Sequence, residues 1–294
     1  MDFVKGRTHT EIGLQHLDYG HVIIGGGFVV SPFSILKNFQ FSRSLSFDVY
    51  HELMNKNGLH QSLMAFMRWQ QMEYLPSYYE GDSGAIPRYR AFVKRPYRLF
   101  HYNLPIGKTS LNFENVMVDM VTKKPVVCAT GMFVNIDPEK RRPAPFPKCL
   151  QDHYTEENCE KVPFNYQKME PKCSVKYDKP QNVVSHTLTS KVVSRLVDSY
   201  KHMNDCSYVI LCFDCLSDAI FSNVFLLKGS IMDYRIRRVS LLYLKECVLG
   251  DIINTVVWQS EQSKWQFKFH VMKNDEVLCQ AEIELFTNDF TFKL

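Results

Sequence analysis

The sequence contains no apolar run long enough to cross a bilayer. Its most apolar stretch, residues 22–36, includes three consecutive glycines and Pro32, and it falls short of the ~20 apolar residues that a membrane-spanning helix needs. A large charge of one sign is also missing, because 35 basic and 31 acidic residues leave a net charge of only +4. Proteins that bind the nucleic-acid backbone are usually far more basic. We therefore expect neither a transmembrane segment nor a nucleic-acid partner.

Targeting signals and metal motifs are scarce as well. The first forty residues mix basic and acidic side chains, which fits neither a secretory signal nor an Arg-rich transit peptide, so we expect a cytoplasmic protein. The nine cysteines are an odd number and all follow residue 127, which favours reduced thiols. Cys212 and Cys215 form the one close pair, and no second such pair completes a zinc site. We expect no metal and no other cofactor.

The sequence has the composition of a folded protein and two stretches with the pattern of an antiparallel meander. It is 45% hydrophobic, 22% charged and 13% aromatic, and 294 residues are enough for about two domains. In both stretches, runs rich in β-branched and aromatic residues are separated by turn-forming residues. The strands are predicted at residues 88–100, 109–120 and 125–137, and at residues 230–246, 252–260, 264–273 and 276–286.

A proline-rich segment separates the two stretches. Residues 138–180 hold seven prolines and no sustained periodicity, which is typical of an exposed linker. We therefore divide the chain into an N-terminal extension (1–40), a first repeat (41–147), a linker (148–182) and a second repeat (183–294).

Upstream of each meander we predict a strand, a polar turn and a helix. In the second half these are residues 190–197, the turn from Asp198 to Asn204, and a helix after it. In the first half they are residues 41–47, 48–55 and 58–75. One apolar stripe is predicted on the second helix, formed by Tyr208, Leu211, Cys212, Cys215, Leu216 and Ala219. Two copies of an α+β module, each with a long helix across a curved antiparallel sheet, explain this pattern.

The second turn resembles the D-x-x-x-H-x-N-x-x-x-Y signature of hotdog-fold acyl thioesterases. Downstream, Glu246-Cys247 is similar to a Glu-Cys pair in plant-type acyl-ACP thioesterases. The family's tandem form carries two hotdog repeats in one chain and would cover about residues 40–290. The residues that match the signature are Asp198, His202, Asn204 and Tyr208.

Two departures from the family pattern affect the interpretation. Plant-type enzymes have Asn where this chain has Tyr200, so it is closer there to bacterial acyl-CoA thioesterases, and the carrier stays open between CoA and acyl carrier protein. In the first repeat, His51 falls one position early and no Tyr follows at the right distance. We interpret the first repeat as degenerate, with a structural or acyl-binding role.

The resemblance implies a role for each matched residue. Free N–H groups at the start of the helix would stabilise an oxyanion, and Asn204 would cap or orient that helix. Asp198 or Glu246 would act as general base or nucleophile, while His202 orients water or substrate. The alternatives are that Asp198 only forms a turn and that Glu246 is a solvated residue of an edge strand. Cys247 would point to the opposite face of the strand from Glu246.

Substrate contacts are predicted at Tyr200, Tyr208, Arg235 and Arg237. The arginines would hold the phosphates of coenzyme A or the acidic face of an acyl carrier protein, unless they only form a solvated face.

The resulting hypothesis is a hydrolase that cleaves fatty acyl thioesters, as a monomer or homodimer. The alternative is a non-catalytic acyl-thioester-binding or scaffold protein with the same fold. A tandem-hotdog dehydratase is a third option, but the sequence lacks the hydratase signature.

Overall fold

The computed structural model describes residues 3–5, 9–14, 21–24, 27–30, 32–59, 63–79, 97–166, 176–198, 201–229, 231 and 234–286. The chain divides into two compact units. Unit 1 comprises residues 1–18 and 37–170, and unit 2 comprises residues 19–36 and 171–294. The division at 170/171 falls inside the segment that we expected as the linker, and the expected N-terminal extension is shared between the two units. Each unit is of the α+β class.

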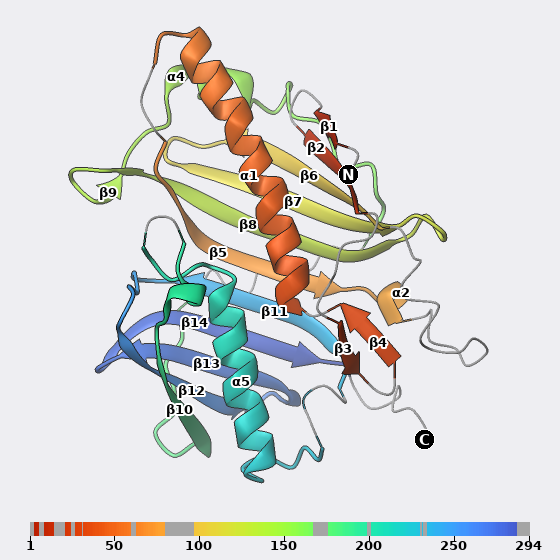
Figure 1. Cartoon of the computed structure of the whole chain (residues 1–294), viewed down its shortest axis with the longest axis vertical. Coiled ribbons are helices and arrows are strands. Elements are labelled where there is room, and N and C mark those ends of the chain that lie inside the picture. Colours follow the sequence, from red (N-terminus) through yellow and green to blue (C-terminus); the bar gives the residue numbers. More distant parts are fainter. Residues whose placement is uncertain are drawn as a thin grey trace. The chain divides into compact units, whose positions relative to one another are not determined.

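Unit 1 contains an antiparallel sheet with strand order β1-β2-β6-β7-β8-β5. Helix α1 (Pro32–Lys56), which belongs to unit 1 from Lys37 onward, lies across one face of the sheet (Figure 1). The short helices are α2 (Pro76–Tyr79) and α4 (Lys148–His153), and β9 (Arg142–Pro143) pairs with the end of β8. The strands are β1 (Phe3–Lys5), β2 (His9–Leu14), β5 (Ala65–Tyr74), β6 (Tyr97–Ile106), β7 (Ser110–Asp119) and β8 (Pro125–Asp137).

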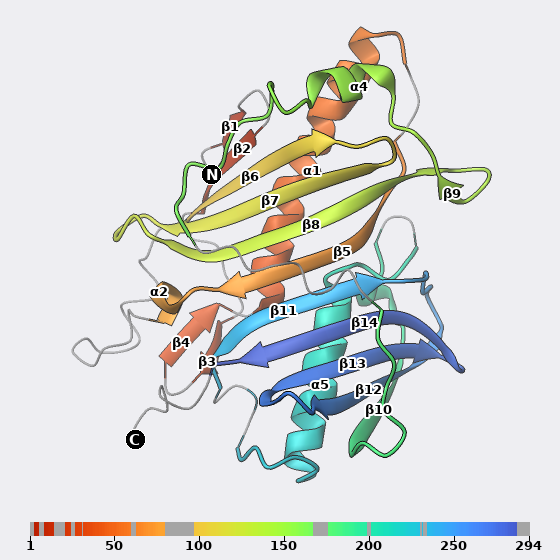
Figure 2. The same cartoon turned by 180° about the vertical axis from the view of Figure 1, so that it is seen from behind.

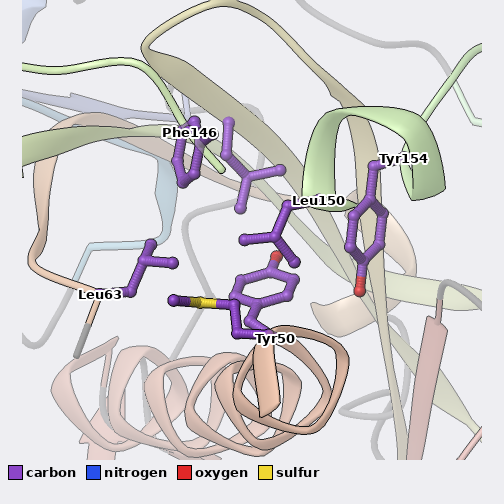
Figure 3. Packing of buried hydrophobic residues seen from close by; sticks show 7 residues of the cluster. Tyr50, Leu63, Phe146, Leu150 and Tyr154 are labelled. Carbon is purple, nitrogen blue, oxygen red and sulfur yellow. The ribbon is translucent and has the colours of Figure 1, made fainter. Parts of the chain in front are cut away.

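The C-terminal end of α1 is held by an apolar core. Figure 3 shows Tyr50 of α1 facing Leu63, Phe146, Leu150 and Tyr154, all of them buried. The rings of Tyr50 and Tyr154 meet edge to face with centroids 5.3 Å apart. Burying such aromatic side chains contributes ~1.5–3 kcal/mol each, so this core fixes α1 on the sheet and on α4.

Unit 2 repeats the plan with strand order β11-β14-β13-β12-β10, again antiparallel. Figure 2 shows this sheet from the side opposite its helix α5 (Ser207–Phe221), which lies against β10 and β12. The hairpin of β3 (His21–Ile24) and β4 (Gly27–Val30) forms a separate two-stranded sheet. The strands are β10 (Ser185–Lys191), β11 (Ile236–Tyr243), β12 (Ile252–Ser260), β13 (Ser263–Lys273) and β14 (Glu276–Leu285).

The sequence of α5 explains both its orientation and its end. All six residues of the predicted apolar stripe are buried, which confirms that prediction, and the thiol of Cys215 contacts the carbonyl of Thr255 on β12 at 3.1 Å. The helix ends where Asn223 adopts a left-handed conformation (φ 55°). The N–H groups of Asn223 and Val224 then donate to the carbonyls of Ile220 and Ala219, which is the Schellman arrangement.

The prediction for the start of unit 1 is wrong. The predicted strand at 41–47 and the turn at 48–55 both lie inside α1, and most of the predicted helix at 58–75 is strand β5, which pairs with β8. The last five residues of β5 are all buried. A strand buried on both faces has no period of two, so residue spacing alone does not distinguish it from a helix.

The linker is not exposed as we expected. Val162, Phe164 and Tyr166 pack on the sheet of unit 1, and Tyr166 donates to the buried carboxylate of Glu114. Tyr177 packs on the sheet of unit 2, where its hydroxyl donates to the carbonyl of Ala281 at 2.6 Å. The aromatic residues of this proline-rich segment therefore cover sheet faces. No helix in the described part of the chain is long and apolar enough to span a membrane.

Candidate active site

A closed turn carries the matched signature between a short 3₁₀ helix (Ser194–Leu196) and α5. The backbone N–H of Asp198 donates to the carbonyl of His202 at 2.9 Å, and the carboxylate Oδ1 of Asp198 accepts from the N–H of His202 at 3.2 Å. Lys201 adopts a left-handed conformation (φ 63°) that closes the turn. Asp198 thus uses one carboxylate oxygen to shape the turn, as the alternative reading predicted. Tyr200 lies outside the described residues.

A second loop lies beside this turn and carries Glu246. We expected Glu246 and Cys247 on a strand, but β11 ends at Tyr243 and both residues belong to the loop that follows it. The N–H of Met203 donates to the carbonyl of Cys247 at 2.7 Å, and His202 forms an isolated antiparallel bridge with Val248. This antiparallel backbone pairing holds the loop against the signature turn.

The loop brings a carboxylate and an imidazole together. The His202 Nε2 and Glu246 Oε2 atoms are 3.6 Å apart, with side-chain exposures of 19% and 44%. Glu246 is therefore partly open to solvent, whereas most of the His202 side chain is covered. A carboxylate and an imidazole at this separation can hold a water molecule and take a proton from it.

The start of α5 differs from the expectation of free N–H groups. The helix begins at Ser207, and the side-chain Oδ1 of Asn204 accepts from the N–H of Cys206 at 2.9 Å. The N–H of Ser207 donates to the carbonyl of Asn204, and that of Val209 donates to the carbonyl of Cys206. Asn204 therefore orients the helix start as predicted, but these three amides already have acceptors. The positive end of the helix dipole and the side-chain NH₂ group of Asn204 are still available to an oxyanion.

Tyr208 is placed beneath the site and not on its surface. Its side chain is 3% exposed, and its ring meets that of Tyr243 edge to face at 5.3 Å. Tyr243 in turn donates its hydroxyl to the carbonyl of Asp205 at 2.9 Å. Burial raises the pKa of Tyr208 well above its ordinary value. Tyr208 supports the turn, and the structure gives it no exposed surface for a substrate.

The structure does not bring Arg235 and Arg237 to the turn. They lie at the start of β11, while Glu246 follows its end, and a strand of eight residues spans about 25 Å. Arg237 pairs with Glu284 at 2.8 Å. A cavity of about 700 Å³ is likewise remote from the site, at the C-terminal end of α5, lined by residues 180–184, 224–226 and 259–261.

Asp251 is the residue that sequence reasoning missed at this site. Its carboxylate accepts from the N–H of Val248 at 3.1 Å and from Lys273 Nζ at 2.8 Å. In the sequence, Gly250-Asp251 indicates only a turn between two strands. Within the described residues, no cluster of His, Cys, Asp or Glu has the arrangement of a metal site.

Known proteins share the architecture of this chain. Residues 177–287 match the profile of the family described as acyl-ACP thioesterase C-terminal domain. A 12:0-ACP thioesterase from Umbellularia californica is 13% identical, with 96% of this chain and 98% of that chain covered and a TM-score of 0.70. An acyl-ACP thioesterase from Bacteroides thetaiotaomicron is 14% identical, with 95% and 98% covered and a TM-score of 0.63. No curated protein matches the sequence. These similarities show the hotdog fold of the acyl-ACP thioesterases.

Proposed function

We propose that this chain, with an acyl-ACP thioesterase C-terminal domain at residues 177–287 and the fold of acyl-ACP thioesterases throughout, hydrolyses fatty acyl thioesters. The observation that carries the proposal is the pairing of His202 with Glu246 at 3.6 Å, on two loops that are hydrogen-bonded to each other. A scaffold protein would have no need to hold these two groups together at a half-exposed position.

In the proposed reaction Glu246 is the general base. It takes a proton from a water molecule that His202 orients, and the water oxygen attacks the thioester carbonyl. The negative charge on the carbonyl oxygen is stabilised by the Asn204 side chain and the N-terminal end of α5. When the tetrahedral intermediate collapses, the C–S bond breaks and the thiolate leaves with the proton from Glu246. The products are a fatty acid and the free thiol of the carrier.

The structure favours Glu246 over Asp198 for this role. The Oδ1 atom of Asp198 already accepts from the N–H of His202, and moving Asp198 toward a substrate would open the turn. Glu246 is 44% exposed and lies in a loop whose backbone is fixed. Asp198 is therefore assigned the role of holding His202 in place.

Acyl carrier protein is the proposed carrier. The matched family takes its name from acyl-ACP, and the arginines expected to bind the phosphates of coenzyme A lie at the far end of β11, one of them in an ion pair with Glu284.

Release of free thiol tests the function. Purified protein would be supplied with short, medium and long acyl chains on acyl carrier protein and on coenzyme A, beside the Asp198→Asn plus Glu246→Gln double variant as the blank for its own cysteines. We expect turnover on acyl-ACP that disappears in the double variant. A folded protein that binds acyl-ACP and never releases thiol would overturn the proposal in favour of the acyl-binding alternative.

Isotope labelling tests the role of Glu246. In H₂¹⁸O under single-turnover conditions, a general base places ¹⁸O in the fatty acid during the first turnover. A carboxylate nucleophile would instead transfer its own ¹⁶O to the acid and retain ¹⁸O in the protein.

A further inference from the structure

The loop that carries Glu246 has no helix or strand of its own to hold it. It runs from the end of β11 at Tyr243 to the start of β12 at Ile252, and Glu246 itself is 44% exposed. The N–H groups of Leu244 and Lys245 donate to the carbonyl of Leu278 and hold the start of the loop. The far end also has to be held, because losing about 1 Å of placement costs a catalytic group up to ~10²-fold in rate. The placement of Glu246 therefore depends on what anchors the loop.

Asp251 anchors the loop at its far end. Its Oδ2 atom accepts from the N–H of Val248 at 3.1 Å and lies 3.7 Å from the Sγ of Cys247, while its Oδ1 atom accepts from Lys273 Nζ at 2.8 Å. The Asp251 side chain is 12% exposed, and its backbone carbonyl accepts from the N–H of Val192 at 2.8 Å. One buried carboxylate thus ties two residues of the loop to strand β13.

The protonation states of Cys247 and Asp251 are consistent with a hydrogen bond from the thiol to the carboxylate. Burial, followed by the charge of Asp251, raises the pKa of the Cys247 thiol to about 12, so the thiol keeps its hydrogen and donates it. Burial alone would raise the pKa of Asp251, but the bonds from Lys273 and the Val248 amide lower it below its ordinary value. Cys247 is therefore a hydrogen-bond donor here and not a nucleophile.

The anchored residues are the ones that touch the signature turn. Val248 forms the bridge with His202, and the carbonyl of Cys247 accepts from the N–H of Met203. The chain of contacts runs from Lys273 to Asp251, then through the loop backbone to His202.

We propose that Asp251, held by Lys273 and by the thiol of Cys247, is a positioning residue that keeps Glu246 beside His202. The proposal rests on the function proposed above for Glu246. Cys247, the second member of the Glu-Cys pair, then serves as a hydrogen-bond donor to Asp251. Glu246 is the residue that reacts, and Asp251 is the residue that positions it.

The first test compares Asp251→Asn with Glu276→Gln. Glu276 pairs with Lys245 of the same loop, but both side chains are about half exposed, so its loss is the matched control. We expect Asp251→Asn to lower kcat by up to ~10²-fold with a much smaller change in KM, because substrate still binds while the base is misplaced. Equal effects of the two variants, or a loss confined to KM, would overturn the proposal.

A comparison of kcat between conservative and non-conservative replacements distinguishes these contacts from a general loss of stability. Cys247→Ser keeps a donor toward Asp251 and is expected to retain kcat, whereas Cys247→Ala is expected to lower it severalfold. Lys273→Arg and Lys273→Met form the corresponding pair, in which the arginine is expected to retain kcat and the methionine to lower it. This pair replaces Asp251→Asn if that variant does not fold. Equal kcat within both pairs contradicts the proposed contacts.

Amide hydrogen exchange of the same variants separates this inference from the proposed function. We expect Asp251→Asn to speed exchange at residues 201–204 and 246–250 while residues 212–219 of α5 keep their protection. If the wild type turns over no acyl thioester, the proposed function fails, and unchanged exchange at residues 201–204 would refute the positioning role independently.

Discussion

His101 is a buried histidine whose titration is expected to control the acid stability of unit 1. Its ring is 1% exposed, between Asn115 at 2.8 Å from Nδ1 and Asn103 at 3.0 Å from Nε2. Burial lowers the pKa of His101 to about 4, and the charge of Arg43 lowers it further, against the opposing effect of the two amides. At neutral pH the ring is therefore uncharged inside the fold.

The magnitude follows from the two pKa values. A pKa shift of one unit corresponds to about 1.4 kcal/mol. The drop in the pKa of His101 from the ordinary 6.5 to about 4 therefore corresponds to about 3 kcal/mol in the free energy of unfolding. Between these values the unfolded chain binds the proton and the folded protein does not. The folded protein therefore has this full stability above pH 6.5. The free energy of unfolding decreases as the pH falls, and this contribution of about 3 kcal/mol is lost below about pH 4.

Urea unfolding at several pH values between 7 and 4 measures this effect. The wild type is compared with His101→Gln, which cannot titrate, and with His51→Gln, which removes an exposed histidine from α1 as a control. Unit 2 is the same in all three proteins, so the difference between the curves isolates the histidine. We expect the wild type and the control to lose about 3 kcal/mol more than His101→Gln over this range. Parallel curves for the wild type and His101→Gln would refute the reasoning, since they would mean that His101 is charged in the folded state.

Three further substitutions test the packing of β8 and the buried ion pairs. A side chain at Gly131 would place its Cβ 2.4 Å from the ring of Phe113 and 2.8 Å from a backbone carbonyl, so Gly131→Ala should lower the free energy of unfolding by ~1–3 kcal/mol in a urea titration; an unchanged midpoint contradicts the packing of β8. Arg238 is fully buried in ion pairs with Glu284 and a second glutamate, and Arg238→Met should cost ~3–5 kcal/mol. Arg237→Met, at an exposed pair with the same Glu284, should cost below ~1 kcal/mol, and equal losses would show that the buried pairs are not special.

Most strands of the two meanders could be predicted because they alternate and end at turn residues, but the strand predicted at 88–100 shares only residues 97–100 with β6. The prediction of residues 252–260 as a strand coincides with β12, and those for 264–273 and 276–286 differ from β13 and β14 by one residue. The stripe of α5 was equally clear, since it repeats over three turns.

The start of unit 1 was harder to predict because polar side chains are buried among the apolar residues of its core. The buried residues of α1 recur at helical spacing, at Ile35, Phe39, Tyr50 and Met54, but the buried Arg43 interrupts this apolar face. Arg43 lies over the ring of Phe113 at 5.1 Å, and Tyr50 donates to Asn103 at 2.7 Å. Such pairs form between strands and helices that are distant in sequence, and residue spacing carries no trace of them.

The resemblance pointed to residues that the structure places on two neighbouring loops, where Glu246 lies beside His202 and Asp198 accepts from the backbone N–H of His202. Their catalytic roles, and that of Asn204, stay predictions. The dependence of Glu246 on Asp251 and Lys273 was not visible, because the lysine is on β13 and the contact is made only when the sheet forms.

The most direct test of the account is the rate of thiol release from acyl-ACP by the Glu246→Gln variant beside the matched Glu276→Gln variant. We expect kcat to fall at least ~10²-fold in Glu246→Gln, the usual contribution of a general base, while Glu276→Gln keeps the rate of the wild type. Wild-type turnover by a folded Glu246→Gln protein would contradict the assignment of the site.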